Sequence, residues 1–571
     1  MLKQFVFRLM PIFAVIFLAS CSDTAEVLDT STEVAPVAEA PAVAEDNRPN
    51  FLVIMVDDMG YTDLGIYGSE INTPNLDQLA REGLILTDFH NQAVCAPTRA
   101  ALMSGRDPHN AGGAMHVTPN QEGVPGYETY LNDDVVAFPE QLQNGGYNTY
   151  MAGKWHLGGA EDQTPNARGF DRSFALMQGG GSHYSDGRGM FEFARVSDYR
   201  EDGVPVPELP EDFYSSVFYT DYIIDSIDQG DQSKPWFAFL SFTAPHWPLH
   251  APEEDIARYE GMYDEGYEVL RESRIEAGKS AGVIPEAATP YRRLDRVSAW
   301  DDLSDEEKRI SSRKMEIYAT MVDIMDENVG RLIDHLKQTG DYDNTYIMFF
   351  SDNGAEGAPR NPGANGTDWV FDNSYENMGK VGSHIYYDAD WAQAGVGVGR
   401  YFKGFPSAGG TLAPAIIHAP NLTKKGQISD QFISVIDIAP TFLELAGIEP
   451  TTVNRYGDPI EPMQGISFAD FTTGDATQVR PDDFVFGWEI FGHRAIRKGD
   501  WKLLRMSSLP AEMGQRAYGI QDTDYWGLYD VSVDPGETND LSDDHPEIVE
   551  ELLAEWDNYM EGNGIILPIR P

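Results

Sequence analysis

An α/β fold is predicted for this chain of 571 residues by three observations. Apolar runs of strand length recur along the chain, and each ends in a cluster of polar residues. Stretches with apolar residues at helical spacing lie between these runs. In the region from 313 to 350, an amphipathic helix over 313–338 is stopped by Gly340 and followed by the apolar run 346–350. A helix, a short turn and a buried strand in this order are typical of a sheet covered by helices.

The first 20 residues predict an export signal. Basic residues precede an apolar run over 10–18, which is too short to span a bilayer. The sequence L-A-S-C at 18–21 resembles a bacterial lipobox, which implies that Cys21 anchors the mature chain to a membrane through lipid. Because Ser22 rather than aspartate follows, the sorting habit of lipoproteins favours the outer membrane, with the protein facing the periplasm or the cell surface. An ordinary signal peptide with an unrelated cysteine is the alternative.

Residues 21–50 are rich in alanine, valine, proline, threonine and acidic residues. A segment of this composition buries little apolar surface, so we expect a disordered tether. The folded part is expected to start at Phe51, which leaves enough chain for one large domain with a smaller one.

Acidic residues strongly outnumber basic ones. The chain has 92 Asp plus Glu against 41 Lys plus Arg, which gives a net charge of −51. Phosphate binding needs basic patches, so this balance argues against nucleic acid as a partner. It is typical of proteins from a saline habitat, and we expect a marine bacterium as the source.

Four of the apolar runs end in residues that carry chemistry. The runs and the residues that follow them are 51–56 with Asp57 and Asp58, 148–151 with Lys154 and His156, 236–240 with His246, and 346–350 with Asp352 and Asn353. Ligands of open α/β sheets bind beyond the carboxyl ends of parallel strands. The sequence therefore predicts that these residues share one crevice. Lys154 and His156 stand two apart in an extended segment, so their side chains are expected to point to the same side.

Two of these clusters offer oxygen ligands for a metal ion. Asp57, Asp58 and Asp352 supply carboxylates and Asn353 supplies an amide oxygen, the hard donors that Ca²⁺ or Mg²⁺ prefers. The adjacent acids Asp57 and Asp58 repel each other unless a cation neutralises them. The alternative for 352–354 is an ordinary turn, because Asn-Gly is common turn chemistry.

Cys95 opens the segment C-A-P-T-R, which is followed by L-M-S-G-R at 102–106. Pro97 and the apolar residues after it predict a helix that begins close to the cysteine, at the end of the macrodipole that favours anions. With Cys21 lipidated, Cys95 has no disulfide partner within the chain. A small buried apolar residue is the alternative role of such a cysteine.

Together these motifs resemble those of type I sulfatases of the alkaline-phosphatase superfamily. The segments that carry the likeness are 57–65, 73–77, 95–99, 153–158, 244–248 and 351–354, and they occur in the order found in that family. Within it, the chain is most similar to bacterial arylsulfatases of the pseudomonad type, through 151–158, 168–170, 241–248, 351–357, 494–497 and 499–502. The resemblance covers nearly all of 51–571.

The resemblance implies that a formylglycine-generating or sulfatase-maturing enzyme oxidises Cys95 to formylglycine. The hydrate of that aldehyde would attack the sulfur of a sulfate ester, and Arg99 and Lys154 would hold it. One Ca²⁺ would be bound by Asp57, Asp58, Asp352, Asn353 and an oxygen of the modified Cys95.

Three further residues take roles in proton transfer by the same resemblance. His246 with Lys403 would assist the departing alcohol oxygen, and His156 would take the proton of the second hydroxyl so that sulfate is expelled. The turn that follows this lysine in the family contains an arginine, but the corresponding 409–414 of this chain has none. Two alternatives to a catalytic Lys403 therefore remain. The catalytic lysine is Lys380 instead, or Lys403 is an ordinary solvated lysine of a loop.

The family fold implies a catalytic domain over 51–480, with a mixed central sheet flanked by helices. A smaller domain over 481–571 would have antiparallel strands near 484–488 and 501–504 and a final helix near 546–560. The loop with His183 and Tyr184 either lines the substrate pocket or is packed.

Sulfate ester hydrolysis, on aryl, alkyl or glycan sulfates, is the predicted function. One rival is a phosphonate monoester or phosphodiester hydrolase of the same superfamily. The other is a lipid-anchored protein that binds sulfated glycans without catalysis, if Cys95 is unmodified.

Overall fold

The computed structural model describes residues 46–569 except for 116–117, 192–193, 296, 358–370 and 508–524. The predicted signal peptide, Cys21 and most of the predicted tether lie outside the described residues. Arg48 lies 4.7 Å from the ring centre of Tyr147 and donates a hydrogen bond to the carbonyl of Gly145. The last residues that the sequence assigned to the tether therefore contact the folded chain. Among the described residues, no helix is long and apolar enough to cross a membrane.

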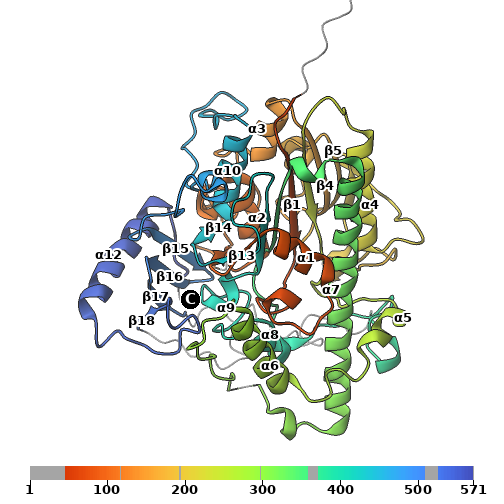
Figure 1. Ribbon diagram of the computed structural model, residues 1–571, viewed down its shortest axis with the longest axis vertical. Coiled ribbons are helices and arrows are strands. Elements are labelled where there is room, and N and C mark those ends of the chain that lie inside the picture. Colours follow the sequence, from red (N-terminus) through yellow and green to blue (C-terminus); the bar gives the residue numbers. More distant parts are fainter. Residues whose placement is uncertain are drawn as a thin grey trace, which may run out of the picture. The chain divides into compact units, whose positions relative to one another are not determined.

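A ten-stranded mixed sheet forms the centre of the structure (Figure 1). Its strands are β1 (Asn50–Val56), β2 (Leu84–Leu86), β4 (Asn148–Lys154), β5 (Arg172–Leu176), β8 (Tyr199–Glu201), β9 (Val204–Pro205), β10 (Trp236–Ser241), β11 (Thr345–Ser351), β12 (Ala415–His418) and β13 (Gln427–Ser429). Their order across the sheet is β13-β2-β12-β11-β1-β10-β4-β5-β8-β9. Two short pairs lie outside it, β3 (Phe89–His90) with β14 (Ile433–Ser434) and β6 (Arg188–Phe191) with β7 (Ala194–Val196).

The four apolar runs singled out in the sequence are the central strands β11, β1, β10 and β4. Each pairs in parallel with its neighbour, so their carboxyl ends lie at the same edge of the sheet. Every residue of β1, β10 and β11 is buried, which explains why these strands read as continuous apolar runs without alternation.

Helices cover both faces of this sheet (Figure 1). The longer ones are α1 (Pro74–Glu82), α2 (Cys95–Ser104), α3 (Phe138–Asn144), α4 (Ser215–Gln229), α6 (Tyr267–Ala281), α7 (Asp305–Thr339), α8 (Asp388–Gly395) and α10 (Ile438–Leu445). Shorter ones are α5 (Glu253–Ile256), α9 (Ala408–Thr411) and α11 (Ala469–Thr473). Helix α4 packs with α7, and α2 packs with α3 and α10.

Helix α7 contains the helix predicted over 313–338 and starts earlier. Ser304 caps its first turn by accepting a hydrogen bond from the Glu307 backbone N–H, and the Glu307 side chain bonds back to Ser304. Gly340 ends it with a φ of 88°, in the left-handed region that suits glycine.

The C-terminal part forms a separate antiparallel sheet, in the order β15 (Val485–Ile490), β16 (His493–Lys498), β17 (Trp501–Arg505) and β18 (Gly527–Asp530). Helix α12 (Pro546–Gly562) packs on it through Leu552 and Trp556. The predicted fold is confirmed: a large mixed sheet flanked by helices, then a smaller antiparallel sheet with a final helix. The domain boundary near residue 480 stays a prediction.

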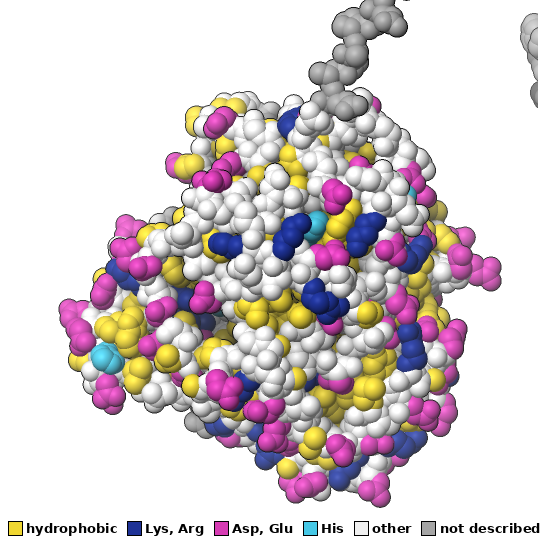
Figure 2. All heavy atoms as spheres, in the orientation of Figure 1, with side chains coloured by type: hydrophobic (Ala, Val, Ile, Leu, Met, Phe, Trp, Pro, Cys, Tyr) yellow, Lys and Arg dark blue, Asp and Glu magenta, His cyan; other side chains and the backbone are white. Residues whose placement is uncertain are grey.

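The surface carries the acidic excess of the sequence. Asp and Glu side chains are spread over the face shown in Figure 2, with Lys and Arg scattered among them. Some basic side chains are buried, among them Arg99, Lys154 and Lys403.

Candidate active site

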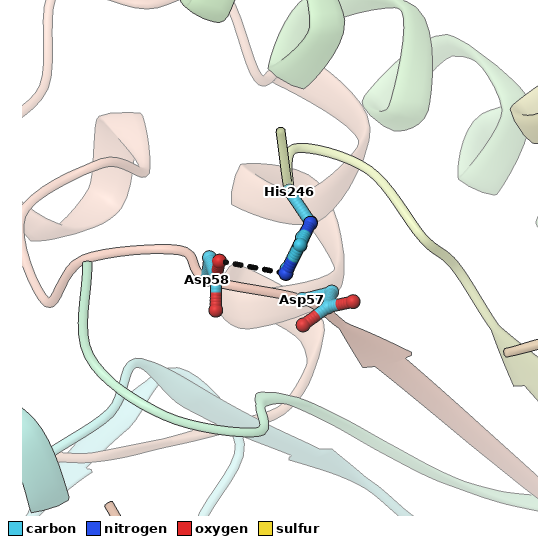
Figure 3. Close-up of side chains that lie close together, drawn as sticks. All are labelled: Asp57, Asp58 and His246. Atoms are coloured by element: carbon cyan, nitrogen blue, oxygen red, sulfur yellow. Dashed lines mark ion pairs between the residues drawn. The ribbon is translucent and has the colours of Figure 1, made fainter. Parts of the chain in front are cut away.

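The carboxyl ends of the central strands gather the residues predicted from the sequence. Asp57 and Asp58 directly follow β1, and Asp352 follows β11, where its N–H donates to the carbonyl of Val56. Lys154 is the last residue of β4. Figure 3 shows His246, which comes from the loop after β10, pointing toward Asp57 and Asp58. Residues from four distant parts of the sequence thus form one cluster.

Cys95 is the first residue of α2 and is buried. Its Sγ lies 3.4 Å from Nδ1 of His156. Burial raises the pKa of the Cys95 thiol, and the ammonium groups of Lys154 and Lys403 oppose this shift. The side chain is therefore held at a helix N-terminus among cations, a setting that favours an anionic group bound there.

Arg99 lies one turn further along α2 and is fully buried. Its guanidinium donates to Oδ2 of Asp352 from Nε at 3.2 Å and from Nη2 at 2.9 Å. Its Nη1 donates to Oγ of Ser241 and to the carbonyl of Lys154, both at 2.6 Å. Arg99 therefore ties α2 to the ends of three central strands, and its charge is paired with the carboxylate of Asp352.

The buried carboxylates are paired with buried ammonium groups. Lys154 Nζ lies 2.6 Å from Oδ2 of Asp57, and Lys403 Nζ lies 2.6 Å from Oδ1 of Asp58. Burial and the neighbouring Asp352 raise the pKa of Asp57 well above its ordinary value. Burial together with Glu356 and Asp352 raises the pKa of Asp58. So many acids in one dry site are stable as anions only with strong compensating charge.

The donor set fits a hard cation. Within the described residues, Asp57 Oδ1, Asp58 Oδ2 and Asn353 Oδ1 are buried and accept no hydrogen bond. Ligand atoms of Asp57, Cys95 and Asp352 lie within 4.8 Å of one another, and so do those of Asp57, Asp58 and His246. Oxygen atoms left without donors in a dry, acidic cluster are what a Ca²⁺ or Mg²⁺ ion would satisfy.

His156 differs in conformation from what the sequence predicted. It was expected to continue the extended segment of Lys154, but its φ is 59°, in the left-handed region. An added Cβ on Gly179 would lie 2.7 Å from its ring, so only glycine allows the ring to sit there. Burial and the cations Lys154 and Arg99 hold the pKa of His156 well below its ordinary value. The ring is therefore neutral and can accept a proton.

His246 is oriented by contacts on its backbone and on its ring. Nε2 lies 3.5 Å from Oδ2 of Asp58, and Nδ1 contacts the carbonyl of Trp247. The carbonyl of His246 lies 3.0 Å from Nε2 of His183, whose Nδ1 lies 2.7 Å from Oγ of Ser215. Burial lowers the pKa of His183 to about 4, so this ring is neutral and fits the role of donor to the carbonyl. Of the two alternatives for the His183 loop, the packed one is found.

Lys403, and not its alternative Lys380, lies in the cluster. Burial lowers the pKa of Lys403, but Asp58 and Glu356 outweigh burial and raise it well above the ordinary value. Lys380 is 44% exposed and pairs with Glu253 at 3.4 Å. Lys403 therefore lies beside the carboxylates, although the turn that follows it departs from the family pattern.

The sequence reasoning missed Glu356 and Ser241. Glu356 Oε2 lies 3.3 Å from Lys403 Nζ, and its side chain is 4% exposed. Ser241 ends β10 and donates from its hydroxyl to the carbonyl of Lys154. Glu356 had a signal in the sequence, since it is an acid within the motif 351–357, whereas nothing local to Ser241 reveals its contact.

Two family models match the chain. The sulfatase model matches residues 49–448, and the model of the C-terminal part of N-sulphoglucosamine sulphohydrolase matches residues 399–561. An uncharacterized sulfatase of Schizosaccharomyces pombe is 44% identical over 541 residues, covering 92% of this chain and 95% of its own length. The arylsulfatase of Klebsiella aerogenes is 39% identical over 432 residues, covering 75% of this chain and 92% of its own.

Solved structures show the same fold at lower identity. Ps i-CgsB superposes with a TM-score of 0.62 at 24% identity, covering 90% of this chain and 92% of its own. The phosphonate monoester hydrolase of Agrobacterium radiobacter has a TM-score of 0.52 at 20% identity, covering 89% and 95%. The first family model alone covers most of the chain, and with it the strand ends that carry the site, so the chain belongs to the sulfatase family.

Proposed function

We propose that this sulfatase releases inorganic sulfate from aryl, alkyl or glycan sulfate esters, with formylglycine made from Cys95 and one Ca²⁺ bound by Asp57, Asp58, Asp352 and Asn353. The observation that carries this proposal is the position of Cys95, at the start of α2 and within 3.4 Å of a neutral histidine. Formylglycine at residue 95 would supply a hydrate hydroxyl as the nucleophile, and a cation held by these four residues would supply positive charge that polarises the sulfate oxygens.

The chain's own residues would divide the remaining work. Lys154, with Arg99 behind Asp352, places positive charge beside residue 95, where charge on the transferred group develops. His246 and Lys403, both in contact with Asp58, are placed to give a proton or a hydrogen bond to the departing alcohol oxygen. His156 is neutral and next to residue 95, so it is placed to accept a proton there.

Location and maturation extend the proposal. We propose an outer-membrane lipoprotein anchored through Cys21, matured by an enzyme that converts Cys95. The support is the lipobox-like L-A-S-C at 18–21 and the buried setting of Cys95 among cations. The pseudomonad-type likeness and the marine source also remain predictions from the sequence.

Replacement of Cys95 by serine tests the nucleophile. In a host whose maturation enzyme accepts only cysteine, Cys95→Ser should abolish turnover, because a plain alcohol cannot form the hydrate. The assay is sulfate release under multiple turnover, with the mass of the Cys95 peptide as the check on modification. Full activity of the serine variant would refute the mechanism, and an unmodified thiol in active protein would do so too.

A panel of substrates separates the rivals. Aryl sulfates should be tried first, because the arylsulfatase of Klebsiella aerogenes is 39% identical, whereas the N-acetylglucosamine-6-O-sulfatase of Bacteroides thetaiotaomicron is 25% identical. Phosphonate monoesters and phosphodiesters belong in the same panel. Faster turnover of these than of any sulfate would favour the hydrolase rival, and binding without turnover would favour the glycan-binding one.

A further inference from the structure

The segment 396–412, which we call the Lys403 loop, follows α8, includes α9 and carries Lys403 into the site. Two backbone hydrogen bonds fix it there. The N–H of Lys403 donates to the carbonyl of Ala355 at 3.0 Å, and the N–H of Gly404 donates to the carbonyl of Ala93 at 2.8 Å. These bonds fix the backbone at Lys403, and the two arms of the loop, on either side of Lys403, are held by contacts outside the site.

The two arms meet at Arg400. Its carbonyl accepts hydrogen bonds from Oγ of Ser407 at 2.7 Å and from the N–H of Gly409 at 2.9 Å. These bonds join the two ends of the loop at Arg400 and 407–409, which we call the neck. The next residue, Tyr401, has a φ of 57°, which is unfavourable for a residue with a side chain. Strain of this kind persists only where surrounding contacts enforce it. The neck must therefore be held from outside.

The C-terminal sheet supplies contacts to both arms of the neck. On one side, Nη1 of Arg400 donates to the hydroxyl of Tyr529 at 2.8 Å, and the guanidinium lies 5.6 Å from the centre of that ring. On the other, the N–H of Ala408 donates to Oε1 of Glu537 at 3.1 Å, and Lys502 Nζ lies 2.7 Å from the same oxygen. Tyr529 belongs to β18, and Glu537, which follows this strand, contacts the first residue of α9.

The space between the neck and the C-terminal part is only partly filled. A cavity of about 530 Å³ is lined by Ala408, Lys502 and Glu537, together with residues of both sheets. Beside the cavity, the directional hydrogen bond from Ala408 to Glu537 therefore contributes to holding this arm of the loop.

We propose that Tyr529 and Glu537 are positioning residues for Lys403. By holding the neck of the Lys403 loop, they keep the ammonium group beside Asp58, where it assists the departing alcohol oxygen. This inference rests on the role of Lys403 in the proposed function. It gives the C-terminal sheet a part in the leaving-group step, although neither residue touches the substrate.

Tyr529→Phe tests the proposal because it removes one hydroxyl and keeps the ring. We expect kcat for an alkyl sulfate to fall about tenfold, and kcat for nitrophenyl sulfate less than about twofold, since phenolate needs little protonation. KM should stay unchanged for both substrates. Tyr525→Phe is the matched control, because Tyr525 is 58% exposed in the same part of the chain and should leave both rates unchanged.

A double-mutant cycle distinguishes positioning from general stabilisation. In a Lys403→Ala background, Tyr529→Phe should cause no further loss of kcat, because the group that it positions is absent. Losses that multiply, or an equal loss for both leaving groups accompanied by a lower Tm, would overturn the proposal.

Two further variants cover the case in which Tyr529→Phe does not fold. Arg400→Gln removes the same hydrogen bond from the other side, and Glu537→Gln acts on the second arm of the neck; both go through the same cycle. If Lys403→Ala alone keeps full activity on alkyl sulfates, the proposed role of Lys403 is wrong. If it loses activity and the cycle is additive, only the positioning proposal is wrong.

Discussion

At the scale of single residues, the two histidines of the site have different neighbours and hence different expected roles. His156 contacts Cys95, whereas His246 contacts Asp58. In the proposed mechanism, a proton donor to the leaving oxygen and a proton acceptor at residue 95 act at different moments of one turnover. The separation of these contacts is what makes the roles testable.

Replacing each histidine by alanine should give different defects. His246→Ala should slow alkyl sulfates about 100-fold or more and nitrophenyl sulfate only a few-fold, because poor leaving groups need a proton. His156→Ala should release a single burst of nitrophenol and then leave the mass of a sulfate on the Cys95 peptide. Stopped-flow absorbance and peptide mass spectrometry measure the two effects. His545→Ala, with a side chain 39% exposed, is the control.

Two results would contradict the roles proposed for His246 and His156. Equal slowing of all leaving groups by His246→Ala would contradict its role as proton donor. Continuous turnover without a retained sulfate in His156→Ala would contradict the role of His156.

The metal prediction concerns the orphaned carboxylate oxygens. Chelation should remove activity, and Ca²⁺ should restore it better than Mg²⁺, because every expected ligand is an oxygen atom in an irregular cluster. Asp58→Asn should weaken Ca²⁺ binding about 100-fold. Calorimetric titration and metal analysis measure this, with the surface change Asp301→Asn as control. Unchanged binding by Asp58→Asn would place the metal elsewhere.

The acids of the site were predictable because they come at the ends of buried strands. Asp57, Asp58 and Asp352 stand out as acids after apolar runs, and Cys95 stands out within its motif. The roles of Ser241 and His183 were not predictable, since their importance comes from contacts with residues far away in the sequence. The left-handed φ of His156 was missed because a positive φ is uncommon for residues other than glycine, and nothing in the local sequence marks it.

At the scale of elements, the approach of β4 to β10 decides where Lys154 lies. Gly153 has a φ of 113°, and a Cβ built on it would lie 1.8 Å from the carbonyl oxygen of Ser241. Any larger residue must separate the two strands or rotate the backbone. Either movement displaces the next residue, Lys154, from Asp57.

Gly153→Ala should therefore lose both stability and activity. We expect the free energy of unfolding to fall by about 3 kcal/mol and sulfate release to fall even in the folded fraction. Gly146→Ala is the matched control: its φ is 93°, but the nearest atom lies 3.6 Å from a built Cβ, so only the backbone cost of about 1 kcal/mol applies. Urea unfolding measures both. Equal losses would show that the close approach is unimportant.

Some helices and strands could be predicted from the sequence, and others could not. The four central strands and α7 were predictable because long apolar runs and a sustained helical period mark them. The strands β2 and β13 have three residues each and carry too little pattern. The strand order could not be predicted, because it pairs segments as distant as β2 and β12.

At the scale of the whole molecule, a buried ionic chain joins the large sheet's domain to the C-terminal part. His109 contacts Asp107 at 2.8 Å and Glu489 of β15 at 3.0 Å. The hydroxyl of Tyr559, in α12, donates to the same Asp107. Burial alone would lower the pKa of His109, but the carboxylates of Asp107 and Glu489 outweigh burial and raise this pKa to about 9.

This histidine should make stability depend on pH in the alkaline range. Its folded pKa of about 9 exceeds the unfolded value of 6.5, so its contribution is complete below 6.5 and is lost as the pH rises through 9. The shift corresponds to about 3 kcal/mol. Urea unfolding at pH 6 and pH 9.5 measures it, with His109→Gln as the comparison. An equal pH effect in the variant would show that other groups are responsible.

Cys95 is covered by residues that are synthesised much later than Cys95 itself. Ile490 and Phe491, at the turn between β15 and β16, pack against Cys95, and all three are buried. During translation, Ile490 and Phe491 are synthesised long after Cys95, because about 400 residues separate positions 95 and 491. At 5–20 residues per second that delay is roughly 20–80 s. The proposed maturation enzyme would therefore have its best access to the thiol in the interval before the last part of the chain folds over it.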